Sequence, residues 1–322
     1  MRALPSCLVA CSLAAWAADA SPAILLFPAV GRRDDVTVSG RVLKESPHGR
    51  HALSRNLREL TAETWEGAPV ELTLEGQTLK QTSSNEGDFT ARFQFKEHPL
   101  EAGIHTVEAR VPGATGKIGV QLLDDAAPFL LVSDLDDTLS VTNVLHKDKL
   151  AKAALLEEGN TQPAVPGMAE LYQCLLADKP IKPGIALVTG TPIQYVPRTL
   201  VFLDTHSFPF MGVYPRELSA ATLNDYKQPV IRKLFRQLPH PSICVGDSGE
   251  HDPEVYGQMR KEFPDRVLRI YIHDVGRDDD PKRFDGMFVF KQAREAAQDA
   301  LSRGYLTRAC FDREFPTQAP PP

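Results

Sequence analysis

The residues best suited to chemistry are carboxylates that follow an apolar run near the middle of the chain. The run 129–133 leads directly into Asp134-Leu135-Asp136-Asp137-Thr138. Residues two apart on an extended segment point to the same side, so Asp134 and Asp136 are expected to face one small volume. The pattern predicts an acidic centre at the end of a buried strand.

Two further polar clusters each follow an apolar run of their own. Thr189-Gly190-Thr191 offers hydroxyls and backbone N–H groups that suit an oxyanion, and the segment 246–252 adds the aspartates Asp247 and Asp252. Open α/β sheets bind ligands at the carboxyl ends of their strands. We therefore expect five acids to converge there: Asp134, Asp136, Asp137, Asp247 and Asp252.

Such a cluster of carboxylates requires a positive counter-charge. Two carboxylates about 4 Å apart repel by roughly 4 kcal/mol at an effective dielectric near 20. A hard divalent ion with oxygen ligands relieves this repulsion, and Mg²⁺ suits a site that also holds a phosphate. The sequence therefore predicts Mg²⁺ as the cofactor.

The elements that must position these residues alternate between strand and helix patterns. Continuous apolar runs, typical of strands buried on both faces, occupy 129–133, 184–190, 241–247 and 265–275. Helical patterns occupy 166–179, 228–237, 252–263 and 291–303. This alternation predicts an α/β fold with a mostly parallel, doubly wound sheet.

The first half of the chain has a different period. Within residues 36–122, apolar and polar residues alternate in short segments separated by Gly, Pro, Ser and Asn, which is typical of a small antiparallel β-sandwich. Leu57 and Leu60 could lie on one face of a short helix that interrupts this pattern. The predicted division is a signal peptide (1–20), a β-sandwich domain (21–127), an α/β domain (128–308) and a disordered tail (309–322) that ends in three prolines.

The N-terminal residues resemble an export signal. Arg2 precedes an apolar stretch at 8–18, and Ala18-Asp19-Ala20 has the form of a signal-peptidase site. The stretch is shorter than the about 20 apolar residues that a spanning helix needs, so we expect a mature chain without a transmembrane span, in the periplasm or secreted. An uncleaved anchor, a mis-assigned start codon and lipidation at Cys11 are the alternatives.

Charge and cysteine content limit the partners and the covalent links. With 36 basic and 42 acidic residues, the formal charge is −6, which gives no reason to expect nucleic acid as a partner. Removal of the signal leaves three cysteines, and this odd number argues against a complete disulfide framework. Cys174 and Cys244 lie in apolar patterns and are predicted to be buried thiols.

The motifs resemble those of the haloacid dehalogenase superfamily: DLDDT its first, LVTGTP its second and VGDSGEHD its fourth. Together with PGMAELY and RIYIHDV, they resemble more narrowly the phosphatidate phosphatase catalytic domain of the actin-patch-associated type and its bacterial secreted relatives, over roughly 128–305. The resemblance implies a haloacid dehalogenase-like Rossmannoid domain and Mg²⁺-dependent hydrolysis through an aspartyl-phosphate. The preceding sandwich is also similar to that of bacterial members.

The resemblance implies a role for each carboxylate. Asp134 would be the nucleophile and a metal ligand. Asp136 would be the general acid and would bind the metal through its carbonyl. Asp247 would complete the metal ligands, and Asp252 would position the Mg²⁺ shell. For Asp136 to donate a proton near neutral pH, its acidic neighbours must raise its pKa.

The same resemblance assigns the remaining site residues. Thr189 would hold the phosphoryl oxygens, and Lys227 would stabilise the charge of the intermediate, with Lys233 as the competing candidate. The family often has Ser-Asn-Ser-Pro where residues 189–192 read Thr-Gly-Thr-Pro. The hydroxyls are kept and the Asn side chain is lost, which bears on substrate orientation more than on phosphoryl chemistry.

The predicted function is hydrolysis of phosphatidate, or a related lipid phosphomonoester, to diacylglycerol and phosphate at a membrane surface. The segments 139–165 and 193–226 are too short for a bulky lid, so a large phospholipid headgroup could enter. Two alternatives stay open: a phosphatase of soluble phosphomonoesters such as nucleotides or sugar phosphates, and a non-catalytic binding protein of the envelope.

Overall fold

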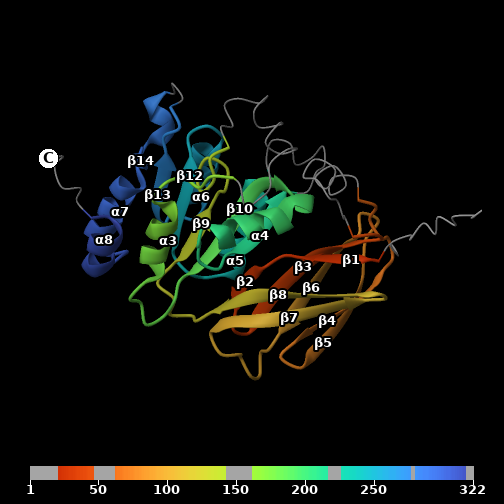
Figure 1. Cartoon of the computed structure of the whole chain (residues 1–322). Helices are drawn as coiled ribbons and strands as arrows, with labels where there is room; N and C mark the ends of the chain where they lie inside the picture. Colours follow the sequence, from red (N-terminus) through yellow and green to blue (C-terminus); the bar gives the residue numbers. More distant parts are fainter. Residues whose placement is uncertain (1–20, 47–61, 143–161, 217–225, 277–279, 317–322) are drawn as a thin grey trace, which may run out of the picture.

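A computed structural model describes residues 21–46, 62–142, 162–216, 226–276 and 280–316 of the chain. These residues form two β-sheets, one after the other along the sequence, and helices flank the second sheet (Figure 1). The protein is therefore a mixed α/β one, and its two sheets occupy the two halves in which the sequence changes period.

The first sheet has eight strands in the order β1-β3-β2-β8-β7-β4-β5, with β6 paired to β3. The strands are β1 (Ala23–Leu26), β2 (Ala29–Arg32), β3 (Asp35–Leu43), β4 (Pro69–Leu74), β5 (Gln77–Thr82), β6 (Asp88–Gln94), β7 (Gly103–Val111) and β8 (Ala114–Leu123). The predicted alternation is confirmed, since Val36, Val38 and Val42 of β3 are all buried. The β-sandwich itself stays a prediction.

The second sheet has six strands, all parallel, in the order β11-β10-β9-β12-β13-β14. The strands are β9 (Leu130–Ser133), β10 (Gly184–Pro192), β11 (Gly212–Arg216), β12 (Ser242–Asp247), β13 (Val267–His273) and β14 (Phe288–Phe290). Every residue of β9 and β12 is buried, as expected for central strands covered on both faces.

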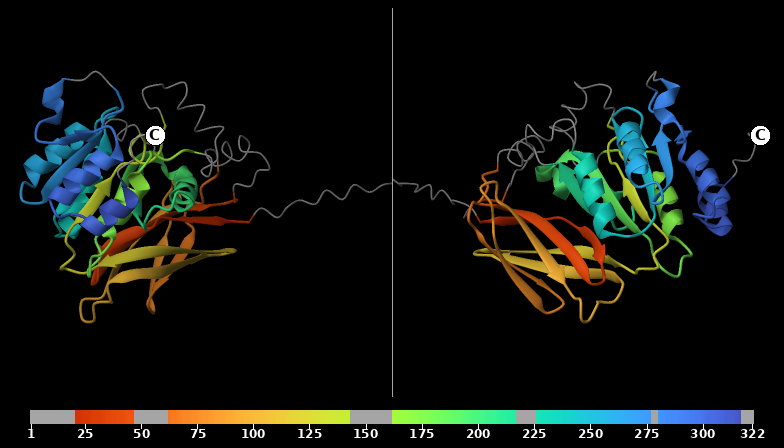
Figure 2. Two further views of the ribbon diagram at one scale, coloured as in Figure 1. Left: turned by 60° about the vertical axis from the view of Figure 1, so that its left-hand side comes forward. Right: turned by 180° about the vertical axis from the view of Figure 1, so that it is seen from behind.

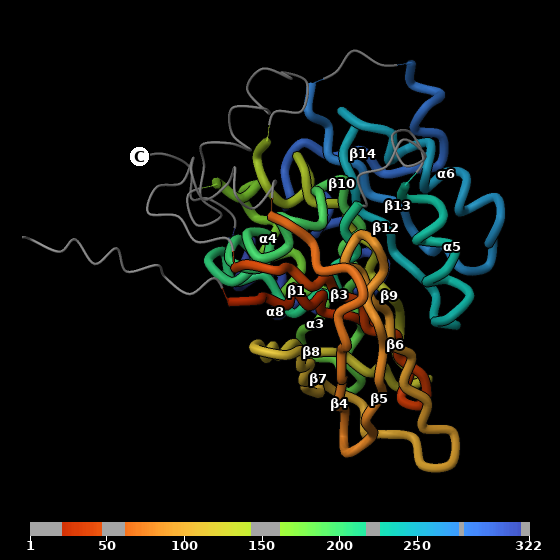
Figure 3. Tube along the Cα trace, turned by 90° about the vertical axis from the view of Figure 1, so that its right-hand side faces the viewer, coloured from red at the N-terminus to blue at the C-terminus, as the bar shows by residue number. Residues whose placement is uncertain are grey.

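Helices cover both faces of the parallel sheet. On the face of Leu131 pack α3 (Met168–Leu176), α4 (Val196–Thr205), α7 (Ala293–Ser302) and α8 (Arg308–Glu314). On the face of Val132 pack α5 (Lys227–Gln237) and α6 (Asp252–Glu262). Figures 2 and 3 show α5 and α6 side by side, on the opposite side of the sheet from α3 and α8. Two short 3₁₀ helices, η1 (Ile193–Tyr195) and η3 (Pro281–Phe284), follow β10 and precede β14.

The two sheets are in direct contact through β2 and the edge strand β11. The N–H of Val213 donates to the carbonyl of Pro28 (2.8 Å), and the Tyr214 hydroxyl accepts from the N–H of Val30 (3.1 Å). Val30 packs in the apolar cluster beneath α5 and α6. The first sheet thus supports the parallel sheet at an edge.

Two predictions about the C-terminal region are wrong. Residues 309–316 are not a disordered tail, because Arg308–Glu314 form α8, whose residue Phe311 is buried. Cys174 is not a free thiol, because it forms a disulfide with Cys310 that links α3 to α8. The two cysteines lie 136 residues apart, so no local pattern marks them as partners. Cys244 is a buried free thiol, as predicted.

Some expectations lie outside the described residues: the signal peptide 1–20 with Cys11, the short helix around Leu57 and Leu60, and residues 317–322 of the tail. Among the described residues, the structure contains no helix that is both long and apolar enough to cross a membrane.

Candidate active site

The polar ends of three adjacent parallel strands meet at one edge of the sheet. Asp134 directly follows β9, Thr189 lies in the last part of β10, and Asp247 ends β12. Two helices on the same face also start here: Lys227 is the first residue of α5 and Asp252 the first of α6. Asp134, Thr189, Lys227, Asp247 and Asp252 are all buried.

Lys227 is the central cation of this cluster. Its ammonium lies 2.8 Å from Asp134 Oδ1 and 3.5 Å from Glu250 Oε2, and it donates a hydrogen bond to Asp252 Oδ1. Burial alone lowers the pKa of an ammonium, but the charges of Asp134 and Asp252 outweigh it and raise the pKa of Lys227 well above its usual value. Lys233, the competing candidate, is exposed on α5. The structure thus brings Lys227 to the site.

Asp252 and Asp247 are tied to each other and to the backbone. Asp252 Oδ2 accepts a hydrogen bond from the N–H of Asp247 (3.2 Å). Asp247 Oδ1 accepts from the N–H groups of Gly249 (2.6 Å) and Glu250 (3.1 Å). This close approach requires glycine at position 246, where a Cβ would lie 2.3 Å from Asp252 Oδ2. The loop after β12 is therefore built to present the second oxygen of Asp247.

The donor set fits a hard divalent cation. Asp134, Asp247 and Asp252 each offer an oxygen, and these oxygens lie within 4.8 Å of one another. Asp134 Oδ2 and Asp247 Oδ2 are buried without a hydrogen-bond partner, which is costly unless a cation or a proton joins them. Both oxygens of Asp252 already accept hydrogen bonds. Asp134 and Asp247 are thus the carboxylates most available as ligands.

Burial and mutual repulsion perturb these carboxyl groups. Burial raises the pKa of Asp134 to about 6 against the attraction of Lys227. Burial, with the charges of Asp252 and Asp134, raises the pKa of Asp247 to about 9. A bound cation would take the place of these protons.

Asp136 lies on the hydroxyl-rich side of the site. Burial, together with the charges of Asp134 and Glu250, raises its pKa to about 8, in the direction that a general acid requires. Its Oδ2 accepts from the Thr191 hydroxyl (3.4 Å). The Thr189 hydroxyl in turn donates to Thr191 Oγ1 and accepts from the Thr191 N–H, both at 3.0 Å. Asp136 is outside the three-carboxylate group, so a part in metal binding would have to come from its backbone carbonyl.

The expectation that Asp137 joins the acidic centre is wrong. Its carboxylate instead accepts from the N–H (2.7 Å) and the hydroxyl (3.1 Å) of Thr142. The Asp137 backbone is left-handed, with φ of 53°, and His273 Nδ1 lies 2.6 Å from the Asp137 carbonyl. Glu250 is the acid that sequence reasoning missed, since its helix-start position resembles that of a solvated cap.

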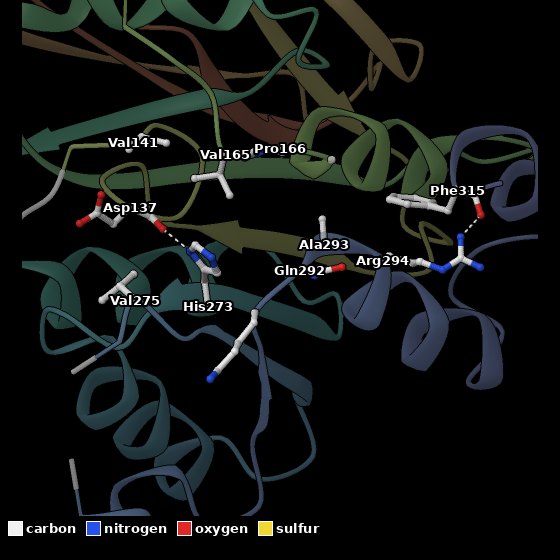
Figure 4. A pocket seen from close by; sticks show the side chains of 12 residues that line it. Asp137, Val141, Val165, Pro166, His273, Val275, Gln292, Ala293, Arg294 and Phe315 are labelled. Carbon is white, nitrogen blue, oxygen red and sulfur yellow. Dashed lines mark hydrogen bonds between the residues drawn. The ribbon is translucent and has the colours of Figure 1, made fainter. Parts of the chain in front are cut away.

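A pocket of about 570 Å³ lies beside the Asp137 loop, at the carboxyl ends of β13 and β14 (Figure 4). Asp134 and Lys227 are not among the residues that line it. Its walls are mostly apolar, with His273 and Lys291 among the polar lining residues. The lining residues are Asp137, Val141, Val165, Pro166, Gly167, His273, Val275, Lys291, Gln292, Ala293, Arg294 and Phe315. The pocket and the acidic centre thus share the Asp137 loop.

The sequence also matches a known family of phosphatase-like hydrolases. This match agrees with the parallel sheet and with the acidic centre at its strand ends. Residues 129–274 match the family described as "Phosphatidate phosphatase APP1, catalytic domain". The narrower resemblance seen in the motifs is thereby confirmed.

Two curated relatives are similar to part of the chain. The chain is 29% identical over 156 residues to phosphatidate phosphatase APP1 of Saccharomyces cerevisiae. The aligned region covers 44% of this chain and 25% of the yeast protein. The chain is 28% identical over 157 residues to an uncharacterized protein of Schizosaccharomyces pombe, covering 46% of this chain and 25% of that protein. The chain thus spans about a quarter of the length of these relatives.

Solved structures give weaker likenesses. The Pnkp1/Rnl/Hen1 complex matches with a TM-score of 0.35 and 16% identity, over 51% of this chain and 55% of the matched one. A carbohydrate acetylesterase from Xanthomonas citri matches with a TM-score of 0.32 and 11% identity, over 88% and 76%. At such scores neither likeness establishes a shared fold.

Proposed function

We propose that this protein is a Mg²⁺-dependent phosphatase that hydrolyses phosphatidate, or a related lipid phosphomonoester, to diacylglycerol and phosphate. The observation that carries the proposal is the arrangement of Asp134 in a domain of this family. One of its oxygens is held 2.8 Å from the Lys227 ammonium, while the other is buried without a hydrogen-bond partner. A carboxylate oriented and left unpartnered in this way is suited to attack a phosphoryl group.

The proposed reaction has two steps. One carboxylate oxygen of Asp134 attacks phosphorus in line, leaving the other for the metal, and the bond from phosphorus to the ester oxygen breaks as Asp136 gives that ester oxygen its proton. Water then attacks the phosphorus of the aspartyl-phosphate while Asp136 takes a proton from the water. Inorganic phosphate leaves and Asp134 is restored as a carboxylate.

The other site residues stabilise charge in both steps. The Lys227 ammonium and the Thr189 hydroxyl would contact the phosphoryl oxygens. Mg²⁺, held by Asp134, Asp247 and the carbonyl of Asp136, would neutralise charge on the phosphoryl group and its attacking carboxylate. Asp252 would fix Lys227 and the loop of Asp247 in place, because its two oxygens bond to both.

The architecture that goes with this chemistry is a haloacid dehalogenase-like domain preceded by a β-sandwich. The six parallel strands, with helices on both faces and acids at the ends of β9 and β12, support the first part. The alternating burial in the first eight-stranded sheet supports the second.

A lipid substrate is supported by the pocket beside the Asp137 loop. Its mostly apolar walls offer space for a hydrocarbon part of the leaving group, close to the strand end that carries Asp134. A soluble phosphomonoester would make little use of such walls.

Export of the chain is part of the proposal. The apolar stretch at 8–18 and the Ala18-Asp19-Ala20 site support a cleaved signal. The disulfide between Cys174 and Cys310 supports an oxidising compartment, such as the periplasm or the exterior. There the enzyme would meet its substrate at a membrane surface.

The test is Mg²⁺-dependent phosphate release by the purified chain from phosphatidate vesicles, beside a panel of nucleotide and sugar phosphates. We expect release from phosphatidate that chelation of Mg²⁺ abolishes and that Asp134→Asn lowers at least 1000-fold, with Asp265→Asn, an exposed acid of the same domain, unchanged. Faster release from the soluble panel would overturn the lipid assignment. No release from any substrate by a folded chain would favour a binding protein.

A further inference from the structure

The space above Gly190 is occupied by a tyrosine. A Cβ built on Gly190 would lie 2.5 Å from the Tyr226 hydroxyl oxygen. Gly190 sits between Thr189 and Thr191, whose hydroxyls line the acidic centre. The Tyr226 hydroxyl therefore lies next to the position that a side chain at residue 190 would occupy. It is close to the segment 189–191, which is proposed to hold phosphoryl oxygens.

The Tyr226 hydroxyl has an unused hydrogen-bonding capacity. Among the described residues the Tyr226 hydroxyl has no hydrogen-bond partner, although the side chain is half-buried. Burial raises the pKa of the phenol, against the opposing effect of Lys227, so the hydroxyl stays protonated and can donate. Lys227 Nζ lies 5.9 Å from the ring centroid, which places the tyrosine beside the central cation of the site.

A second cation stacks on the same ring. The guanidinium of Arg216 lies 5.4 Å from the Tyr226 ring centroid. Arg216 ends β11 and pairs in register with Pro192, the residue after Thr191, so it stands at the carboxyl edge of the sheet. Its Nε is buried and has no hydrogen-bond partner among the described residues, and no acid of the described chain forms an ion pair with Arg216.

The charges of the site call for such a cation. The acidic centre contains five carboxyl groups, and Lys227 is already engaged by three of them. A phosphomonoester brings further negative charge, and the Lys227 ammonium must then interact with the phosphate as well as with its acidic partners. Arg216 has no such partner, and a guanidinium presents several N–H donors in a planar fork that matches phosphate oxygens.

We propose that Arg216 and Tyr226 form an anion-recognition pair that holds the non-reacting oxygens of a phosphomonoester, taking over the orientation that a longer side chain at position 190 would provide. The Arg216 fork and the Tyr226 hydroxyl donate to the phosphoryl oxygens from the β11 side, while Lys227 and Thr189 hold them from the other. The pair acts as a specificity determinant for the phosphate group, whether it belongs to a lipid or to a soluble ester. The inference rests on the proposed function only in taking a phosphomonoester as the ligand.

The first test measures binding without turnover. Inorganic phosphate is titrated calorimetrically into the full chain with Mg²⁺ present. A hydrogen bond to a charged group contributes enough that its loss weakens binding by about 10-fold or more. We expect this loss for Tyr226→Phe, which keeps the ring under Arg216, and a larger loss for Arg216→Gln. The control is Arg308→Gln, which removes an arginine stacked on Phe311 of α8 and should change binding less than twofold.

A double-mutant cycle tests the contact with Gly190 directly. Gly190→Ala places a methyl group 2.5 Å from the hydroxyl but 3.1 Å from the ring carbon that carries it. Its effect on phosphate binding should therefore be large in the unmodified chain and within about threefold in the Tyr226→Phe background. Equal effects in both backgrounds would contradict the proposed contact.

Turnover then separates this inference from the proposed function. With phosphatidate vesicles and with a soluble phosphomonoester, Arg216→Gln should raise KM about 10-fold or more, with a smaller change in kcat. Binding of phosphate that depends on Arg216 and Tyr226, in a chain that hydrolyses no ester, would uphold the pair and overturn the phosphatase. Unchanged phosphate affinity in both variants, no phosphate binding by the unmodified chain, or a KM change on vesicles alone would overturn the pair.

Discussion

Replacement of Lys227 by glutamine should cost this protein both stability and turnover. The Lys227 ammonium lies 2.8 Å from Asp134 Oδ1 and bonds to Asp252, and all three groups are buried. Unit charges at 2.8 Å interact by about 6 kcal/mol at an effective dielectric near 20. Protonation of the stranded acids recovers part of this energy, so we expect a loss near the about 3–5 kcal/mol typical of a broken buried pair.

Thermal unfolding of the metal-free chain measures this loss. A loss of about 3 kcal/mol in a domain of this size lowers Tm by roughly 6–12 °C. Mg²⁺ should recover part of the shift, since it supplies the missing positive charge. For the phosphatase reaction, the same energy lost from the transition state lowers kcat by at least about 100-fold.

Lys233→Gln is the matched control, because it removes the same charge from an exposed position of the same helix. Exposed substitutions of this kind change stability by about 0.5 kcal/mol or less, and kcat should stay within twofold. Equal losses from the two variants, or a loss of turnover from Lys233→Gln alone, would refute the assignment of Lys227 as the central cation.

Three further predictions concern the acids and the disulfide. In the folded chain the pKa is about 6 for Asp134 and about 9 for Asp247, and both values exceed that of an unfolded aspartate, so the Tm of the metal-free chain should fall as pH rises from about 4 to 9. Asp247→Asn should make the Tm depend less on pH. A Tm that rises over this range would contradict the expected protonation of these acids. Asp136→Asn should lower kcat at least about 100-fold, whereas Asp137→Asn, which keeps its acceptor oxygen for Thr142, should lower it less than about 10-fold in the same assay. Cys174→Ser should lower the free energy of unfolding by about 2–4 kcal/mol, and reductant added to this variant should lower it no further.

The long buried strands and amphipathic helices could be predicted from the sequence because their patterns are local. The predicted helix 252–263 corresponds to Asp252–Glu262 and the predicted strand 241–247 to Ser242–Asp247. The elements missed are short or contain proline. β11 contains Pro215, which an edge strand tolerates since its outward N–H needs no partner, and α4 has a proline in its first turn, where no N–H is required.

The site could be predicted where strand ends determine it and not where contacts are long-range. Asp134 and Asp247 were placed together because parallel strands end at one edge. The bonding of the Asp137 carboxylate to Thr142 depends on how the loop after β9 folds. The pairing of Cys174 with Cys310 depends on how α8 packs against α3. The stacking of Arg216 on Tyr226 likewise depends on side-chain packing, which spacing along the chain does not encode.

The proposed function depends on phosphorylation of Asp134 during turnover. The most direct measurement is to stop the reaction on phosphatidate vesicles in acid, reduce the acyl phosphate with borohydride and locate the product by peptide mass spectrometry. Borohydride converts a phosphorylated aspartate to homoserine, so we expect homoserine at position 134 that depends on substrate and Mg²⁺. Release of phosphate with an unmodified Asp134, or with homoserine at Asp136, Asp247 or Asp252 instead, would contradict it.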